Sequence, residues 1–259
     1  VVLDVLEPTY AAASLSAPAF LYIRTDVTSE QAVAQAQAQI IERFGRSPSY
    51  VVSCAGVAPA GALLTSPVKM FTRAFDINAA ANVVLAQAFL PAMISNNHGH
   101  FMTVASSASY FSLPNLCAYS MSKTAALAFL ESLRAELRAV YKACRVRTSV
   151  VTPTKVRTVL AEGLNEGDDD FLMPVLEPIQ VARAMADTLN SGLSRNISLP
   201  LGSALLPYLR ALPEWYRGAL RAMGNTDALV TPESISRGQQ ARRGHQSNLD
   251  HMKKLGVHS

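Results

Sequence analysis

Cysteine, tryptophan and formal charge are all scarce in this chain of 259 residues. Its three cysteines show no C-x-x-C spacing, which excludes a disulfide scaffold and a zinc ribbon. Charged residues make up only 16% of the chain and hydrophobic residues 49%, which excludes a disordered protein. The composition therefore indicates a globular protein with a large buried core, from a reducing compartment.

Long apolar runs and a broad basic face are also absent from the sequence. The nearest candidate for a membrane span, residues 79–94, is interrupted by Asn82, Gln87 and Pro91. The net charge of +4 lies in the residues from Arg237 onward, which hold five Lys or Arg and one Asp. Because the rest of the chain is neutral, we expect no nucleic-acid partner and a basic tail that can contact an anionic membrane.

Short β-rich runs alternate with helical stretches along the chain. We expect strands at 1–3, 20–23, 50–52, 101–104, 146–151 and 197–199. We expect helices at 28–44, 117–140 and 178–189, and two helical pieces within 70–93. Thr28 and Gln31 form a capping box that opens the first helix, and Gly45 ends it. The alternation predicts an α/β fold, a doubly wound and mostly parallel sheet with helices on both faces.

Tyr119 and Lys123 stand four residues apart, on one face of the expected helix at 117–140. A tyrosine has a pKa of about 10, too high for a general base at neutral pH, and a nearby ammonium lowers it. The residues from Ile77 to Ser122 include no Asp, Glu, Lys or Arg, so chemistry there lies in a low dielectric. On its own, such a pair is more often an ordinary pair on a helix surface.

Four other features accompany this pair in a fixed order. Asn78 lies in a helix of the uncharged stretch, and Ser106 follows an expected strand. Residues 53–56 form a small-residue turn, and residues 153–158 follow the strand after the Tyr119 helix. Singly, each is an ordinary turn or core residue. Jointly they resemble the short-chain dehydrogenase/reductase superfamily, over Val1 to about Leu229.

The resemblance implies a Rossmann-type fold and a catalytic tetrad of Asn78, Ser106, Tyr119 and Lys123. Tyr119 would exchange a proton with the substrate oxygen, Lys123 would lower the pKa of Tyr119, and Asn78 would hold a water. The resemblance also implies hydride transfer with NAD, favoured over NADP because Asp4 would repel a 2′-phosphate. The implied cofactor contacts are Asp4, Asp26, Val27, Ala55, Gly56, Tyr119, Lys123, Pro153, Val156 and Thr158.

Three further segments, residues 89–91, 99–106 and 171–174, are similar to the retinol dehydrogenase and microsomal 17β-hydroxysteroid dehydrogenase branch. This similarity implies a lipophilic alcohol or ketone as substrate: a retinoid, a steroid or a long-chain lipid. It also implies an intracellular protein, either cytoplasmic or peripherally attached to the endoplasmic reticulum membrane.

No glycine precedes Gly45, whereas the family opens with a strand and a glycine-rich turn that binds pyrophosphate. The expectation is therefore a sheet without its first strand and glycine-rich loop, an N-terminally truncated sequence and weak nucleotide binding. The alternative to an oxidoreductase is a non-catalytic scaffold that has lost this loop.

We expect one domain over residues 1–229 and a polar tail over 230–259. Residues 158–178 are either a lid over a lipophilic substrate or a loop packed on the domain. Residues 203–224 are either a helical pair that closes the substrate cleft or a membrane-interface segment. His98 and His100 lack a third ligand and are interpreted as turn residues, so no metal is expected. A homodimer is compatible with the sequence.

Overall fold

The computed structural model describes residues 1–6, 20–161, 174–223, 230–231, 233–237 and 240. Most of the expected lid at 158–178, including residues 171–173, lies outside the described residues. The same holds for most of the tail at 230–259. The expectations for these two segments stay predictions.

The strands form two parallel sheets in the order that a doubly wound fold requires, which confirms the Rossmann-type α/β fold. β1 pairs with β2, and β3, β4, β5 and β6 pair in that order. Within the described residues, no strand lies between β1 and β3. The strands are β1 Val2–Asp4, β2 Tyr22–Arg24, β3 Tyr50–Ser53, β4 Gly99–Val104, β5 Val146–Pro153 and β6 Asn196–Leu199.

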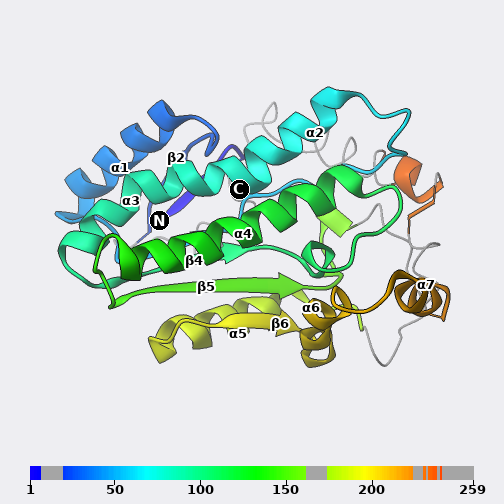
Figure 1. Ribbon diagram of the computed structural model, residues 1–259. Helices are drawn as coiled ribbons and strands as arrows, with labels where there is room; N and C mark the ends of the chain where they lie inside the picture. The colour runs from blue at the N-terminus through cyan, green and yellow to red at the C-terminus, as the bar shows by residue number, and fades with distance from the viewer. Residues whose placement is uncertain (7–19, 162–173, 224–229, 232, 238–239, 241–259) are drawn as a thin grey trace.

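Helices α1, α3 and α4 lie side by side on one face of the strands, and α5 lies on the other (Figure 1). The helices are α1 Glu30–Phe44, α2 Val68–Phe75, α3 Ala81–Ser95, α4 Cys117–Ala139, α5 Pro178–Ser191, α6 Leu206–Leu209 and α7 Glu214–Met223. A π-helical turn, η2 Asp76–Ala80, joins α2 to α3. The described residues also include the 3₁₀ segments η3 Ser107–Ser109, η4 Val159–Ala161 and η5 Leu201–Leu205.

The first helix begins later than its sequence predicts. Ser29, not Thr28, is the N-cap of α1, because the Ser29 hydroxyl accepts a hydrogen bond from the Ala32 N–H at 3.2 Å. The Thr28 hydroxyl instead donates to the Asp26 carboxylate at 2.7 Å. The competing carboxylate two residues before Thr28 is the reason that the expected capping box is wrong. Gly45 ends the helix as expected, with a φ of 71°.

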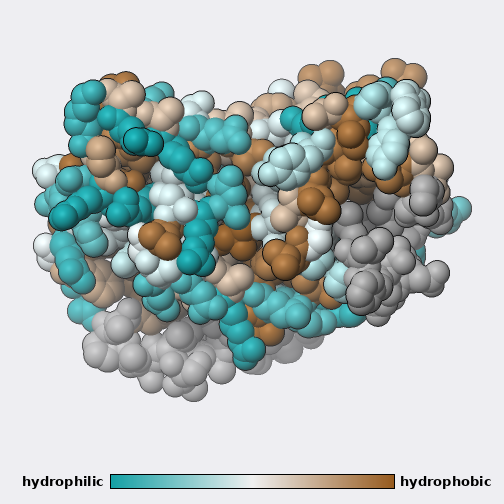
Figure 2. All heavy atoms as spheres, turned by 60° about the horizontal axis from the view of Figure 1, so that its bottom comes forward, coloured by the Kyte–Doolittle hydropathy of each residue, from teal (hydrophilic) through white to brown (hydrophobic). Residues whose placement is uncertain are grey.

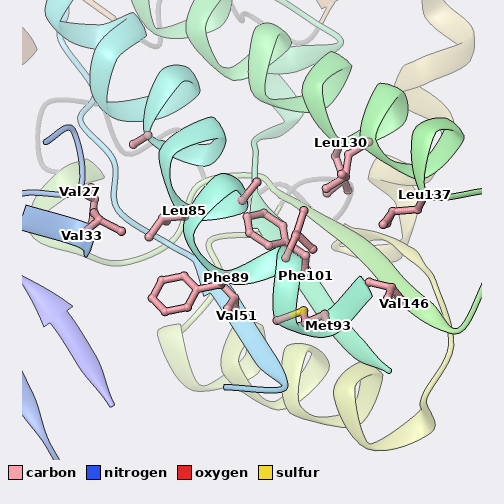
Figure 3. Close-up of a cluster of buried hydrophobic side chains, with 14 of the residues drawn as sticks. Val27, Val33, Val51, Leu85, Phe89, Met93, Phe101, Leu130, Leu137 and Val146 are labelled. Atoms are coloured by element: carbon pink, nitrogen blue, oxygen red, sulfur yellow. The ribbon is translucent and has the colours of Figure 1, made fainter. Parts of the chain in front are cut away.

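The main core lies between the α1–α3–α4 layer and the strands. Phe101 of β4 is fully buried among side chains of α3 and α4, with Leu85, Phe89 and Leu130 close by (Figure 3). A smaller core on the opposite face joins Met102, Val151 and Val181, between β4, β5 and α5. Alternate residues of β4 therefore serve opposite cores, which holds the strand rigidly behind the loop that follows it.

Helices cover the second face of the sheet only in part, contrary to the expectation of helices on both faces. Val51 and Ser53 of β3 are buried, whereas Tyr50 and Val52, which alternate with them, are exposed. In a doubly wound sheet both sets are normally covered by helices. Within the described residues, α5 covers β5 and its neighbours and leaves this side of β3 open.

One helical run, Val68–Ser95, is long and apolar enough to cross a membrane by length and composition. Half of its most apolar window is buried inside the protein. Leu85, Phe89 and Met93 of this run belong to the main core. These contacts are those of a core helix.

Candidate functional site

Tyr119 and Ser106 meet at the carboxyl end of β4. Ser106 caps the 3₁₀ turn η3, where its hydroxyl oxygen accepts a hydrogen bond from the Ala108 N–H at 3.1 Å. The Ser106 hydroxyl also interacts with the Tyr119 phenol, which lowers the pKa of the phenol. Burial raises the pKa of Tyr119, and the interaction with Ser106 offsets part of that rise. The structure thus brings together two of the four expected catalytic side chains.

Lys123 lies one turn further along α4 and is buried. Its ammonium donates a hydrogen bond of 2.8 Å to the Val104 carbonyl, at the end of β4. Burial lowers the pKa of Lys123 to about 8, and the neighbouring Cys54 thiol opposes this effect. The ammonium is thus directed to the Val104 carbonyl, and the expected lowering of the Tyr119 pKa by Lys123 stays a prediction.

Asn78 is held in the π-helical turn η2 and is buried. Its carboxamide oxygen accepts from the Val57 N–H at 2.8 Å. Its amide group donates to the Val57 carbonyl at 2.9 Å and to the Ser122 hydroxyl at 2.8 Å. These contacts engage the side chain that was expected to hold a water. In this structure Asn78 fastens the turn at Val57 to the Tyr119 helix through Ser122.

The turn after β3 packs tightly against the same groups. A β-carbon built on Gly56 would lie 3.2 Å from Asn78 Oδ1 and 3.3 Å from Lys123 Nζ. Only a residue without a side chain allows this approach without displacement. The thiol of Cys54, in the same turn, has its pKa raised by burial, lowered by Lys123 and raised by Asp4. The ends of β1 and β3 therefore face one another across the site.

The expected adenosine-binding residues lie at the ends of β1 and β2. The Asp4 carboxylate accepts a hydrogen bond from the Leu6 N–H at 3.0 Å and stays exposed. Asp26 accepts two hydrogen bonds from Thr28, and these lower its pKa. Val27 packs into the main core, so only its backbone is left for a ligand.

The expected nicotinamide segment follows β5. Val156 forms a bridge with Leu176, and Arg157 pairs with Glu177 at 2.8 Å. These contacts join the two ends of the expected lid to each other. The Thr154 hydroxyl is buried without a hydrogen-bond partner, next to Pro153 at the end of the strand. A buried orphan hydroxyl in this position fits a ligand that carries an amide.

Two ends of a dinucleotide therefore find suitable groups. Tyr119, Lys123 and Thr154 suit the nicotinamide riboside, and the Asp4 carboxylate suits a ribose diol. The pyrophosphate in the middle of the dinucleotide is a different case, because no glycine precedes Gly45 to supply a turn that binds it. The residues of this chain fit the two ends of NAD(P) and offer no glycine-rich turn for its phosphates.

The segment between Ser106 and Tyr119 is tied to the C-terminal helices. Arg210 donates to the Ser109 carbonyl at 2.7 Å, and Arg221 to the Ser112 carbonyl at 2.6 Å. The Arg221 guanidinium also lies 4.4 Å from the centre of the Phe111 ring. A pocket of about 350 Å³ opens beside these contacts, lined by Ser112, Leu113, Pro114, Cys117, Ser120, Met121 and Arg221.

Sequence reasoning missed several of these groups. Val57, Val104 and Ser122 anchor Asn78 and Lys123, and two of them act through backbone atoms that carry no sequence signal. Arg210 lies 101 residues from its partner Ser109, beyond any local pattern.

The interpretation of His100 as a turn residue is wrong. His100 lies in β4, is buried, and its Nε2 is 2.9 Å from the Ser149 hydroxyl. Burial and, to a lesser degree, Arg147 lower the pKa of His100 to about 4. In the part of the chain that the structure describes, no group of three metal-binding side chains forms.

A protein-family model described as short chain dehydrogenase matches residues 4–169 of the chain. A curated relative, Dehydrogenase RED3 of Cochliobolus heterostrophus, is 41% identical over 128 residues, or 49% of this chain. Estradiol 17-beta-dehydrogenase 11 of Pongo abelii is 37% identical over 175 residues, or 67% of this chain. Epidermal retinol dehydrogenase 2 of Mus musculus is 35% identical over 141 residues, or 54% of this chain.

The chain spans 65%, 56% and 45% of the lengths of these three relatives, in the same order. Among solved structures, an alcohol dehydrogenase from Thermococcus sibiricus, complexed with 5-hydroxy-NADP, superposes with a TM-score of 0.58. That match is 21% identical and covers 69% of this chain and 73% of the other, and it shows a shared fold.

Proposed function

This chain belongs to the short-chain dehydrogenase family, and we propose that its protein is an NAD(P)-dependent oxidoreductase that interconverts a hydroxyl and a carbonyl on a lipophilic substrate. The single observation that carries this proposal is the approach of the Ser106 hydroxyl to the Tyr119 phenol, two of the four groups that the resemblance assigns to the tetrad. It directs a hydroxyl donor and a phenol at one point, beside the buried ammonium of Lys123.

Each side chain has a definite task in this reaction. Ser106 donates a hydrogen bond to the substrate oxygen on which charge develops, a pre-aligned contribution that needs no reorganisation. The Tyr119 phenol gives a proton to that oxygen, or takes one from it. Lys123 carries positive charge near the phenol at neutral pH, since its pKa is about 8. A nicotinamide cofactor, when bound, supplies or accepts the hydride.

A lipophilic substrate is supported by two independent observations. The relatives include an estradiol dehydrogenase and a retinol dehydrogenase, both at more than 30% identity. The pocket beside the Ser106–Tyr119 segment is lined mainly by apolar groups, among them Leu113, Pro114 and Met121. We propose a retinoid, a steroid or a long-chain lipid alcohol, NAD rather than NADP, and a location at the endoplasmic reticulum membrane.

The test is a comparison of Tyr119→Phe with Tyr110→Phe in the full product of the gene. Both lose one phenol, but Tyr110 packs against the main core, and the charges that act on its phenol are Glu131 and Arg210. With retinol, estradiol and dodecanol as substrates and NADH absorbance as readout, Tyr119→Phe should lose about 10²–10⁴ in turnover. Tyr110→Phe should retain it.

Equal turnover in wild type and Tyr119→Phe would refute the assignment of the proton donor. No turnover in any variant, with nucleotide bound, would favour the non-catalytic scaffold instead. Circular dichroism of both variants confirms that folding is unchanged.

A further inference from the structure

The pocket of about 350 Å³ beside Arg221, which we name the Ser120 pocket, joins three segments of the chain. Its lining comes from the start of α4, the segment before α4 and α7, and combines apolar groups of Leu113, Pro114 and Met121 with Ser120. These elements lie on the right-hand side of Figure 1, and Figure 2 shows brown, hydrophobic side chains gathered on that same side. The volume lies within the range of small-molecule sites, about 300–1,000 Å³.

Ser120 is the unusual group of this pocket. It is only 1% exposed, and among the described residues its hydroxyl has no hydrogen-bond partner. A serine hydroxyl within a helix can donate to the carbonyl four residues before it. Here the Leu116 carbonyl accepts from the Ser120 N–H at 2.8 Å and not from the hydroxyl. Because an unpaired buried hydroxyl costs free energy, one that is kept beside a pocket fits a ligand oxygen.

The cation of the lining is already engaged within the protein. Arg221 donates to the Ser112 carbonyl at 2.6 Å, and its guanidinium lies 4.4 Å from the centre of the Phe111 ring. The donor that a ligand would meet is therefore the Ser120 hydroxyl. A single hydroxyl in an apolar lining suits a neutral oxygen better than a carboxylate, whose charge needs compensation when it leaves water.

The Ser120 hydroxyl is separate from the reacting groups. Tyr119 precedes Ser120 in α4, and successive side chains on an α-helix diverge by about 100°. The described lining of the pocket includes Ser120 and neither Tyr119 nor Ser106. An oxygen bound at Ser120 is therefore a second oxygen, apart from the one that exchanges a proton with the phenol.

We propose that the Ser120 pocket receives a second, neutral oxygen of the lipophilic substrate, remote from the reacting carbon, and that the Ser120 hydroxyl donates a hydrogen bond to it. The substrate class is then a lipophilic alcohol or ketone with a further ether, hydroxyl or ketone oxygen. A molecule with a plain hydrocarbon end is disfavoured, because it leaves the buried donor unpaired. This inference rests on the proposed oxidoreductase function and narrows its substrate.

The test compares octanol, decanol and dodecanol with their ω-methoxy counterparts. Each counterpart keeps one reactive hydroxyl and adds an acceptor oxygen at the far end, and the series covers three spans. NADH absorbance gives kcat/KM in the full product of the gene, and calorimetry gives the affinities without turnover. At the length that reaches Ser120, wild type should favour the methoxy compound by about five- to ten-fold, the value of one hydrogen bond.

Two serine variants locate the contact. Ser120→Ala should lose the preference for the methoxy compound, because it removes the donor. Ser109→Ala is the matched control, since Ser109 is also buried with a hydroxyl that has no partner among the described residues, and it is not among the described lining residues. It should keep the wild-type preference. Urea unfolding should find both variants at least as stable as wild type, because each removes an unpaired buried hydroxyl.

Equal kcat/KM for the two compounds in wild type at all three lengths would overturn the inference, and so would an unchanged preference in Ser120→Ala. A stronger preference for ω-carboxylate counterparts would overturn the neutral class of ligand. If no alcohol is turned over, the proposed function fails, and the calorimetric affinities still decide the inference. A methoxy preference that Ser120→Ala abolishes then supports it, and equal affinities overturn it.

Discussion

The Lys123 ammonium donates its hydrogen bond to the Val104 carbonyl, the last residue of β4. This contact ties the middle of α4 to the strand end from which the Ser106 loop departs. It also places a cation in a buried environment, since Lys123 is only 4% exposed. The arrangement has a cost in stability that can be measured.

Replacing Lys123 by methionine should stabilise the fold at pH 7. Burial lowers the pKa of Lys123 from 10.5 to about 8, so the charged form costs about 3 kcal/mol. Loss of the hydrogen bond to Val104 offsets about 1–2 kcal/mol of this gain in stability. The variant should therefore be more stable than wild type by about 1 kcal/mol.

The change in stability caused by Lys123→Met should reverse its sign as pH rises. Between pH 8 and 10.5 the unfolded wild type binds more protons than the folded one, so its stability rises with pH and the advantage of Lys123→Met disappears. Urea unfolding at pH 7 and pH 10.5 measures both values. A variant less stable than wild type at pH 7 would contradict the argument.

Gly56→Ala tests the tight packing around Asn78 and Lys123. The new β-carbon would lie 3.2 Å from an amide oxygen that Val57 holds in place. We expect a loss of about 1–2 kcal/mol in the free energy of unfolding. Gly218→Ala is the matched control, because no heavy atom lies within 4 Å of its added carbon.

In α7, Gly218→Ala should stabilise the protein by about 0.5–1 kcal/mol through helix propensity alone. Opposite signs for the two substitutions in urea unfolding would establish that packing, not the loss of glycine, decides the outcome at Gly56. An unchanged free energy of unfolding in Gly56→Ala would show that the turn shifts to accommodate the added carbon.

His100 should make the fold sensitive to acid. Its pKa of about 4 lies below the ordinary 6.5, so the unfolded chain binds the proton first as pH falls. Stability should therefore drop by about 2 kcal/mol between pH 6.5 and 5. His100→Phe should flatten that slope in urea unfolding, and His98→Gln, at an exposed turn, should leave it as in wild type.

Asp4→Asn tests the choice between NAD and NADP. Asparagine keeps an oxygen that can accept from the Leu6 N–H and removes the negative charge at the end of β1. The ratio of kcat/KM for NADPH over NADH should rise by roughly five- to ten-fold. An unchanged ratio would exclude Asp4 as the group that discriminates the two cofactors.

Much of the fold was predictable because strands and helices alternate with clear hydrophobic patterns. The long helix of Tyr119 and Lys123 was expected at 117–140 and is found at Cys117–Ala139. The N-cap of α1 was not predictable, because Asp26 accepts the hydrogen bond of Thr28 in a turn that the spacing does not reveal. The exposed side of β3 was missed for a similar reason, since coverage depends on distant elements.

The site was predictable in its residues and not in its contacts. Spacing indicates that Tyr119 and Lys123 share a helix face, and says nothing of the Val104 carbonyl that takes up the ammonium. The π-helical turn at Asn78 likewise has no local pattern. Hydrogen bonds to backbone atoms of remote segments decide both cases.

The two arginine contacts of the C-terminal helices have a practical consequence. Arg210 and Arg221 donate hydrogen bonds to the Ser109 and Ser112 carbonyls. The planar guanidinium holds such contacts in a well-defined geometry. We therefore expect a tilt of α6 and α7 to displace the segment between Ser106 and Tyr119. Substitutions in the short linker Ala211–Pro213, which is remote in sequence from Ser106 and Tyr119, therefore offer a way to retune this protein.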